Sequence, residues 1–449
     1  MQDLTTGSVT RHLLKTASFM LVTMVVQTLY FLVDLYWVGK LGTDAVAAVG
    51  ITGNLTFIVL ALTQMLGVGT TTLVSHAAGR KDHAHGLRVF NQSQVLSTIA
   101  GIVFLVVFLA TRHTYTAAVG ADATTATLAD TYLLWYIPAM ALQFIMVAQG
   151  AALRGLGQFK PGMIVSTTSV VINMVLAPFL IFGWGTGHPF GVAGAAVSTL
   201  VSVAIAVIWF TTFFLRKDAF LTFTPREWAP DLALWKRMLA IGLPSGAEFL
   251  LTAVYLLVIY TVIKPFGADA QAGFGIAGRI VQAGFMPVVA LGFSVAPVAG
   301  QNVGAKLGAR VREAYRSAAW LAAGTMVALA VIVNVAPRAL AGIFLHEDAP
   351  IQVSTDYLRI VSWSFLASGV IFVNSSLFQA LGRTWPSLAS SALRLTAVLA
   401  PVLWLSTRPG FSLTMIWYLT TASIGLQLVV SSWLLRRELA RTLDHHLTP

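Results

Sequence analysis

The stretch GTDAVAAVGITGN at residues 42–54 returns as GADAQAGFGIAGR at residues 267–279, with seven identities in 13 positions at an offset of 225. The same offset aligns several separated motifs: Leu66, Gly67, Gly79 and Lys81 with Leu291, Gly292, Gly304 and Lys306; Tyr30 with Tyr255; Tyr132 with Tyr357; and Leu156, Gly157 and Pro161 with Leu381, Gly382 and Pro386. Internal similarity at one constant offset indicates a chain built from two related halves.

The composition excludes most soluble classes of protein. The chain has 449 residues, of which 57% are apolar and 10% charged, and its mean hydropathy is +0.79. A soluble domain carries about 25% charged residues, so this chain has too few charged side chains to form a water-exposed surface. It contains no cysteine, which rules out both a disulfide framework and a thiolate metal site. The composition therefore indicates a membrane protein that crosses the bilayer many times.

A membrane-spanning helix needs about 20 mostly apolar residues, and the runs here are too long and continuous for a β-barrel. Twelve such runs occur, at residues 13–39, 45–76, 89–111, 130–155, 161–183, 191–215, 238–263, 270–300, 316–337, 356–381, 386–407 and 411–435. The predicted fold is an all-α membrane protein with twelve transmembrane helices in two six-helix lobes. The N-lobe covers residues 1–215, a charged cytoplasmic linker residues 216–237, and the C-lobe with a short cytoplasmic tail residues 238–449.

The distribution of lysine and arginine predicts the orientation. With a cytoplasmic N-terminus, 20 of the 28 basic residues fall in inner segments, five in outer segments and three within apolar runs. This bias predicts a protein of the cell (inner) membrane with both termini in the cytoplasm. Because each half has an even number of spans, the two lobes share one orientation and should be related by an axis along the membrane normal, which is a transporter architecture.

Ionisable side chains inside apolar spans cost about 2.5–3.5 kcal/mol each on insertion scales, so they are functional candidates by default. Four are good candidates here: Asp34, Glu248, Arg279 and Arg394. In the first span, Thr23, Gln27, Tyr30 and Asp34 follow at spacings of 4, 3 and 4, which places them on one helical face. The seventh span repeats the arrangement with Glu248, Thr252 and Tyr255.

A carboxylic acid in a poorly hydrated cavity can bind and release a proton near neutral pH, and it can also attract an organic cation or a sodium ion. Competition of ion and cargo for one carboxylate is the simplest antiport mechanism. Two alternatives remain open. Asp34 lies near the outer end of its span and could be an interfacial residue, and Glu248 could form a structural ion pair with Arg279 or Arg394.

Three motifs resemble those of multidrug and toxic compound extrusion (MATE) transporters: VDLYWVGKLG at 33–42, NMVLAPFLIFG at 173–183 and GVAGAAVST at 191–199. The resemblance covers essentially the whole chain. It implies two six-helix lobes around a V-shaped cavity and cation-coupled export of amphipathic, often cationic compounds. It also implies that Asp34 is the coupling carboxylate, with Asn173 and Thr199 as the polar residues of the fifth and sixth spans.

Two positions depart from the pattern that the resemblance implies. The second aspartate of the fifth span, four residues after Asn173, is Ala177 here, and the first span has no proline between Leu13 and Gly39. A retained Asp34 with a missing second acid resembles the DinF-like branch of the family.

We therefore expect a secondary active antiporter, not an enzyme, that exports amphipathic, cationic organic compounds in exchange for inward protons. The expected ion-coupling residues are Asp34, Asn173, Thr199, Tyr30 and Gln27, and the expected substrate-binding residues are Asp34, Glu248, Thr252, Tyr255 and Arg279. No cofactor, metal or nucleic acid is expected, and the partners are the bilayer and the small organic substrates of a monomer. The alternatives are a lipid-carrier flippase of the same superfamily and sodium-coupled antiport. An intramembrane enzyme lacks support, because the sequence shows no paired metal ligands, no serine–histidine constellation and no HExxH motif.

Overall fold

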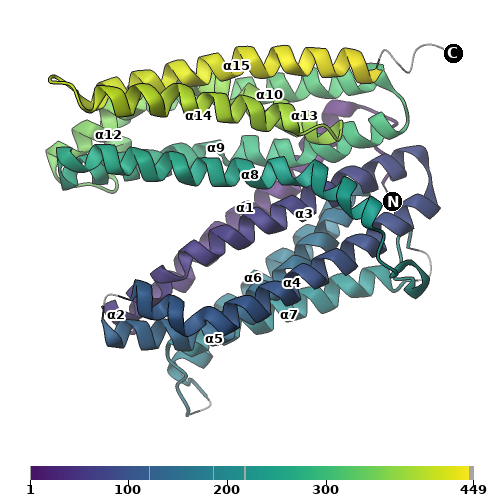
Figure 1. Cartoon of the computed structure of the whole chain (residues 1–449), viewed down its shortest axis with the longest axis horizontal. Helices are drawn as coiled ribbons and strands as arrows, with labels where there is room; N and C mark the ends of the chain where they lie inside the picture. The colour runs from purple at the N-terminus through teal and green to yellow at the C-terminus, as the bar shows by residue number, and fades with distance from the viewer. Residues whose placement is uncertain (1, 121, 186, 217–218, 444–449) are drawn as a thin grey trace. The chain divides into compact units, whose positions relative to one another are not determined.

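The computed structural model describes residues 2–120, 122–185, 187–216 and 219–443 (Figure 1). Within them all regular secondary structure is helical, which confirms the predicted fold class. Lys217 of the predicted linker and residues 444–449 of the predicted tail lie outside the described residues.

The first half contains seven helices among its described residues: α1 (Val9–Gly39), α2 (Thr43–Ile51), α3 (Gly53–Arg80), α4 (His83–Val119), α5 (Ala123–Gly155), α6 (Phe159–Phe182) and α7 (Val192–Phe214). One predicted span, 45–76, is divided between α2 and α3 at Thr52. The Thr52 hydroxyl donates to the carbonyl of Val49 at 2.6 Å, the kind of local side-chain bond that bends helices.

The second half begins with the short η1 (Pro225–Glu227), and its remaining elements are α8 (Leu232–Ile263), η2 (Lys264–Phe266), α9 (Ala268–Gly304), α10 (Gly308–Val335), α11 (Pro337–Gly342), α12 (Asp348–Val361), η3 (Ser362–Ser364), α13 (Phe365–Ala380), α14 (Trp385–Leu405) and α15 (Leu413–Leu443). Here too one predicted span, 356–381, is divided, because the single turn η3 separates α12 from α13.

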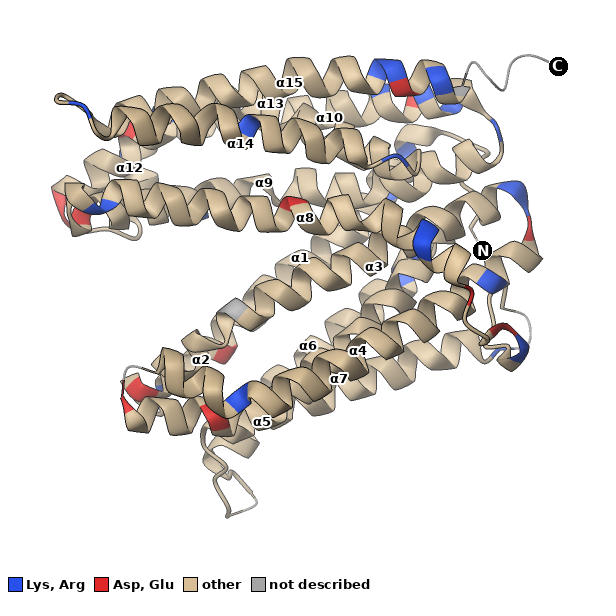
Figure 2. Cartoon of the chain, in the orientation of Figure 1, with Lys and Arg blue, Asp and Glu red and all other residues tan. Residues whose placement is uncertain are grey.

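Twelve segments of the described chain are long and apolar enough to cross a membrane, and each coincides with one of the predicted runs. The prediction of twelve spans is therefore confirmed, and most helices continue several residues beyond the apolar run at one or both ends. Charged side chains gather toward the helix ends, where a spanning helix reaches water (Figure 2).

Matching turns show that the sequence repeat is also a structural repeat. Lys81 and Lys306, aligned by the offset of 225, follow α3 and α9 with φ of 56° and 59°, and they are the only non-glycine residues with positive φ in the described chain. The aligned Gly157 and Gly382 have φ of 73° and 69°. Left-handed backbone at the same points of both halves indicates that the helices end in the same way in each.

Two compact units account for the described residues: residues 2–3 and 18–246 form the first, and residues 4–17 and 247–443 form the second. In the first unit α5 is the central helix and packs against α3, α4 and α7, while α6 lies on α7. In the second unit α9 packs against α10, α12 and α13, and α14 lies beside α15. These packings bring polar residues of different helices together within each unit.

Two adjacent buried amides hold the segment before α8 on the first unit. The Oδ1 atom of Asn91 accepts hydrogen bonds from Thr224 N at 2.9 Å and Trp228 Nε1 at 3.0 Å. The Oε1 atom of Gln92 accepts from Asp231 N at 3.0 Å. Both amide side chains are almost completely buried. The predicted linker is therefore fixed to α4 over these residues.

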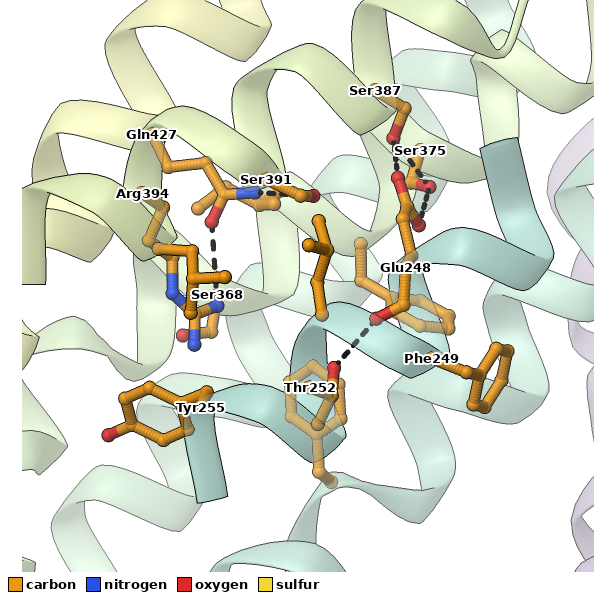
Figure 3. A pocket seen from close by; sticks show the side chains of 15 residues that line it. Glu248, Phe249, Thr252, Tyr255, Ser368, Ser375, Ser387, Ser391, Arg394 and Gln427 are labelled. Atoms are coloured by element: carbon orange, nitrogen blue, oxygen red, sulfur yellow. Dashed lines mark hydrogen bonds between the residues drawn. The ribbon is translucent and has the colours of Figure 1, made fainter. Parts of the chain in front are cut away.

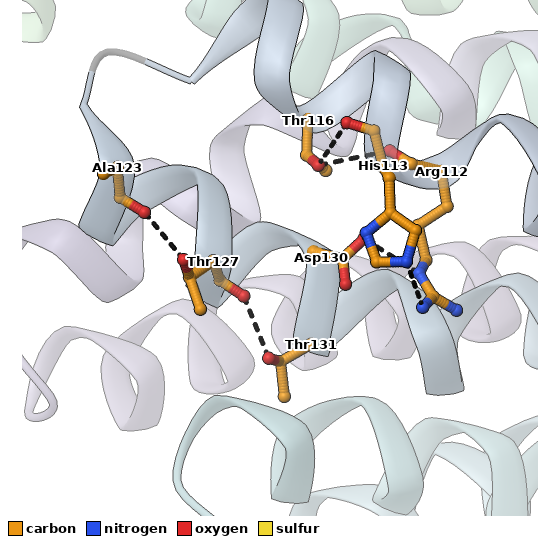
Figure 4. A network of polar contacts seen from close by, with 7 residues as sticks. All are labelled: Arg112, His113, Thr116, Ala123, Thr127, Asp130 and Thr131. Atoms are coloured by element: carbon orange, nitrogen blue, oxygen red, sulfur yellow. Dashed lines mark hydrogen bonds and ion pairs between the residues drawn. The ribbon is translucent and has the colours of Figure 1, made fainter.

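At the other end of α4, an ionic cluster joins α4 to α5 (Figure 4). Arg112 Nε donates to Asp130 Oδ1 at 2.8 Å, and His113 Nδ1 lies 2.9 Å from the same oxygen. The Arg112 and Asp130 side chains are only 16% and 20% exposed. The pair therefore stabilises the packing of α4 on α5 more than a fully solvated ion pair would.

Gly242 provides a test of the packing within the first unit. A Cβ atom on Gly242 in α8 would overlap the carbonyl of Met65 in α3, whereas Gly278 in α9 has no atom within 4 Å of its Cβ position. We expect Gly242→Ala to reduce the free energy of unfolding by about 1–3 kcal/mol through overpacking. Gly278→Ala, the matched control, should be neutral or slightly stabilising because alanine favours helix. Thermal unfolding in detergent measures both, and equal melting temperatures would contradict the close approach.

Candidate functional site

A polar cluster in the first unit joins α1, α6 and α7. The hydroxyls of Tyr30 and Thr199 share a hydrogen bond at 3.3 Å. Asn173 Nδ2 donates to Thr199 Oγ1 at 3.1 Å and to Ser202 Oγ at 3.2 Å. Three of the five predicted ion-coupling residues, Tyr30, Asn173 and Thr199, are thus brought into one network.

Asn173 and Asp34 are among the residues of the first unit whose buried acceptor oxygens have no hydrogen-bond partner in the described chain. The hydroxyls of Ser198 and Thr199 donate to the carbonyl of Ala195 at 2.8 and 3.1 Å, so they are not free to donate elsewhere. In the part of the chain that the structure describes, Asn173 Oδ1 and Asp34 Oδ1 are buried without a hydrogen bond. Buried acceptors in this state are costly, and each is available to a proton donor or a cation.

Asp34 lies among tyrosines. Its charge acts on the phenols of Tyr30, Tyr132 and Tyr136, which places all three near it. The rings of Tyr132 and Tyr136 lie 4.9 Å apart, and the Tyr136 hydroxyl is 3.5 Å from that of Thr56. No lysine or arginine among the described residues forms an ion pair with Asp34.

The polar cluster of the first unit contains neither a second carboxylate at position 177 nor the side chain of Gln27. Ala177 is 1% exposed and packs in an apolar cluster with Tyr132, Ile181 and Ala195, so α6 supplies no second carboxylate beside Asn173. The Gln27 side chain is exposed, and no hydrogen bond joins it to any described residue. The structure therefore does not bring Gln27 to the other predicted ion-coupling residues.

A second site is a cavity of about 350 Å³ inside the second unit (Figure 3). Glu248 of α8 lies at one part of it, where Glu248 Oε1 accepts from Ser387 Oγ at 2.6 Å and Oε2 from Ser375 Oγ at 3.3 Å. Thr252 and Tyr255 also line the cavity, as predicted for substrate-binding residues of this helix. The face of α8 with Glu248, Thr252 and Tyr255 therefore faces a real cavity.

Arg394 of α14 lines the same cavity, next to Tyr255. Its guanidinium carbon lies 5.7 Å from the centre of the Tyr255 ring, and its Nη1 donates to Gln427 Oε1 at 3.5 Å. Gln427 in turn donates to Ser391 Oγ at 3.1 Å. These contacts hold Arg394 at one side of the cavity, and Glu248 lies at the other side (Figure 3).

The positions of Arg279 and Arg394 differ from those that the sequence predicts. Neither Arg279 nor Arg394 is within 4 Å of a Glu248 oxygen among the described ion pairs, so the predicted structural ion pair is not formed. Arg279 is exposed on α9 and does not line the cavity, although we predicted it as a substrate-binding residue. Arg394, which the sequence marks as a functional candidate but not as a substrate-binding residue, lines the cavity instead.

The polar partners in the cavity were missed at the level of sequence. They are Ser375, Ser387, Ser391 and Gln427. A signal was present in α14, where Ser387, Ser391 and Arg394 follow at spacings of 4 and 3 and so share one helical face. Ser375 and Gln427 gave no comparable signal, because their roles depend on which helices pack together.

One contact occurs in the same form in both units. Tyr255 and Thr420 share a hydrogen bond at 3.2 Å, as Tyr30 and Thr199 do in the first unit. The repeat aligned the tyrosines but not the threonines. Each threonine is nevertheless the eighth residue of its helix, since α7 starts at Val192 and α15 at Leu413.

Twelve spanning helices in two repeated halves, with carboxylates placed inside the spans, define a multi-pass membrane transporter. The chain belongs to the MatE family, whose model matches residues 20–179 and 244–405, once in each half. The predicted resemblance to MATE transporters is thereby confirmed at the level of the family.

Curated relatives are named for multidrug resistance or multidrug export. The chain is 26% identical over 376 residues to the probable multidrug resistance protein YoeA of Bacillus subtilis, which covers 83% of this chain and 81% of that protein. It is 26% identical over 367 residues to the multidrug export protein MepA of Staphylococcus haemolyticus, covering 81% of this chain and 80% of the relative.

Solved structures share the fold. A MATE transporter in a bent conformation superposes with a TM-score of 0.92 at 24% identity and covers 99% of this chain and 98% of its own. A transporter of the MOP superfamily from Pyrococcus furiosus gives a TM-score of 0.89 at 24% identity, with 98% of each chain covered.

Glu248 can be tested for a role other than folding. Because its oxygens accept only from hydroxyls in the described residues, the amide oxygen of Glu248→Gln can keep one of these bonds. We expect a melting temperature in detergent close to that of the parent, and a changed affinity for cationic compounds. Ser387→Ala is the matched control, since it removes a partner but keeps the charge. Loss of folding in Glu248→Gln would indicate a structural role.

Proposed function

We propose that this chain is a secondary active antiporter that exports amphipathic, cationic organic compounds across the cell (inner) membrane in exchange for inward protons. Two relatives named for multidrug export or resistance support the type of cargo. The observation that carries the proposal is the buried Oδ1 atom of Asp34, which has no hydrogen-bond partner among the described residues. Basic residues are concentrated in alternate connections, which supports cytoplasmic termini.

The chemistry follows from the surroundings of Asp34. A carboxylate without a cationic partner inside a membrane must be neutralised by a proton or by a bound cation. Tyr30 and Thr199 supply a hydrogen-bonded pair of hydroxyls near it, and Asn173 Oδ1 supplies an unpartnered acceptor. Proton binding removes the charge of Asp34 and so changes which arrangement of these groups is stable. Exchange of a proton for a cationic cargo then becomes a competition for one negative charge.

We further propose that the chain belongs to the DinF-like branch of the family. Retention of Asp34 together with the apolar Ala177 supports this assignment. A lipid-carrier flippase is less well supported, because a phosphorylated headgroup favours a cationic cavity. The cavity of the second unit instead carries one acid and one base, Glu248 and Arg394.

Replacing Asp34 tests the coupling role. Asp34→Asn keeps the shape of the side chain but removes its charge, so proton-driven efflux of a cationic dye from proteoliposomes should fall to background. Asp44→Asn is the matched control, because Asp44 is exposed in the first turn of α2 and should export normally. Near-normal efflux by Asp34→Asn, at equal reconstitution, would refute the assignment.

The coupling ion is proposed to be the proton, with sodium as the alternative. A sodium ion needs several oxygen ligands to replace its hydration shell, and a second negative charge favours it, whereas a proton needs only Asp34. Imposing a pH gradient and a sodium gradient separately on vesicles distinguishes the two. Efflux driven by sodium at zero pH gradient, with protection of the protein from heat by sodium, would overturn proton coupling.

Ala177→Asp restores a second acid at a position that is 1% exposed. If the number of charges decides the ion, sodium-driven efflux should rise in this variant. Ala177→Asn is the matched control, because asparagine has nearly the volume of aspartate but no charge. This variant should not gain sodium-driven efflux. An equal response of both variants would show that space, not charge, is responsible.

A further inference from the structure

The cavity of the second unit contains two opposite charges that do not neutralise each other. Its lining residues include only two charged side chains, Glu248 and Arg394. No described carboxylate is within 4 Å of the Arg394 guanidinium, and only one hydrogen bond of 3.5 Å, to Gln427, uses its donors. A guanidinium has five N–H donors, so most of those of Arg394 have no acceptor among the described residues.

The separation of the two charges follows from the register of α8 and α14. Glu248 is bonded to Ser387, and seven residues further along each helix Arg394 lies over the Tyr255 ring. Seven residues of α-helix rise about 10 Å, so the carboxylate and the guanidinium lie about that far apart along the two helices. No ion pair within 4 Å joins the two groups among the described residues.

Part of the cavity wall is apolar and aromatic. Phe249, Phe285 and Phe372 line the cavity together with Leu251 and Ile371, beside polar residues such as Thr252 and Ser391. The rings of Phe285 and Phe372 meet edge to face, with centroids 5.7 Å apart. A volume of about 350 Å³ fits a drug-sized ligand, and aromatic walls favour an aromatic spacer.

We propose that this cavity binds zwitterions: compounds with an ammonium group for Glu248, an aromatic or apolar spacer, and a carboxylate or comparable anionic group for Arg394. A simple cation would satisfy Glu248 but leave Arg394 without an anion. A zwitterion of matching length neutralises both. This inference rests on the proposed export function, since it names the class of cargo for that transporter.

Three related probes test the charges one at a time: 4′-(aminomethyl)biphenyl-4-carboxylic acid, its methyl ester, which keeps only the ammonium, and its N-acetyl derivative, which keeps only the carboxylate. Calorimetric titration of the full chain in detergent gives the affinities. We expect the zwitterion to bind at least about tenfold more tightly than either singly charged probe, the usual contribution of one charge-assisted hydrogen bond. Equal affinity for zwitterion and methyl ester overturns the proposal without any variant.

Two variants assign each charge to its residue. Arg394→Met should remove the preference for the zwitterion over the methyl ester and leave the ester bound as well or better. Glu248→Gln should remove the preference for the zwitterion over the N-acetyl probe. Arg359→Met is the matched control, because Arg359 is exposed on α12 and does not line the cavity. If Arg394→Met does not fold, Arg394→Lys should retain the preference, and its loss there would count against the proposal.

Export from proteoliposomes separates this inference from the proposed function. If the methyl ester is exported under a pH gradient but the zwitterion is not preferred, the inference fails and the antiporter remains. If none of the probes or cationic dyes is exported, yet the zwitterion shows a preference that depends on Arg394, the antiport proposal fails and the binding site remains.

Discussion

The lack of water inside a membrane is the constraint on which this structure depends, because every polar group there needs a partner from the protein. Many polar side chains of the described spans find a partner on their own helix. The hydroxyls of Ser198 and Thr199, for example, donate hydrogen bonds to the carbonyl of Ala195. Against this background the exceptions are informative. Asp34 and Asn173 each retain a buried oxygen without a partner, and Arg394 retains most of its donors. An ion or a ligand would give these groups the partners that the described residues do not supply.

The spans and the repeat could be predicted because both are properties of sequence order. A long apolar run needs no knowledge of its neighbours, and an offset of 225 is read directly from the residues. Breaks within a span depend on finer local bonds. The division at Thr52 coincides with a hydroxyl bond to the carbonyl of Val49, which hydropathy does not register.

Contacts between helices could be predicted only in part. The spacing of Tyr30 and Asp34 places them on one face, and Tyr30 joins the polar cluster with Asp34 near it, yet Gln27 on the same stripe is exposed. A stripe that follows a long helix meets its neighbours only where they pack against it. Arg279 and Arg394 show the same limit: both interrupt apolar runs, but only Arg394 is turned toward the cavity. Spacing defines a face, and only packing decides what that face meets.

The two units keep the same scaffold but place charge differently on it. A tyrosine of the first helix is bonded to a threonine of the last in both, whereas Asp34 follows its tyrosine by four residues and Glu248 precedes its own by seven. The repeat aligns Arg394 with Ser169, whose hydroxyl donates to the carbonyl of Ser202 at 2.7 Å. The first unit therefore presents a carboxylate among neutral dipoles, whereas the second presents a carboxylate and a guanidinium that line one cavity. A lone carboxylate discriminates by charge alone, which suits a small ion. Two opposite charges at a fixed distance also discriminate by length, which suits an organic cargo.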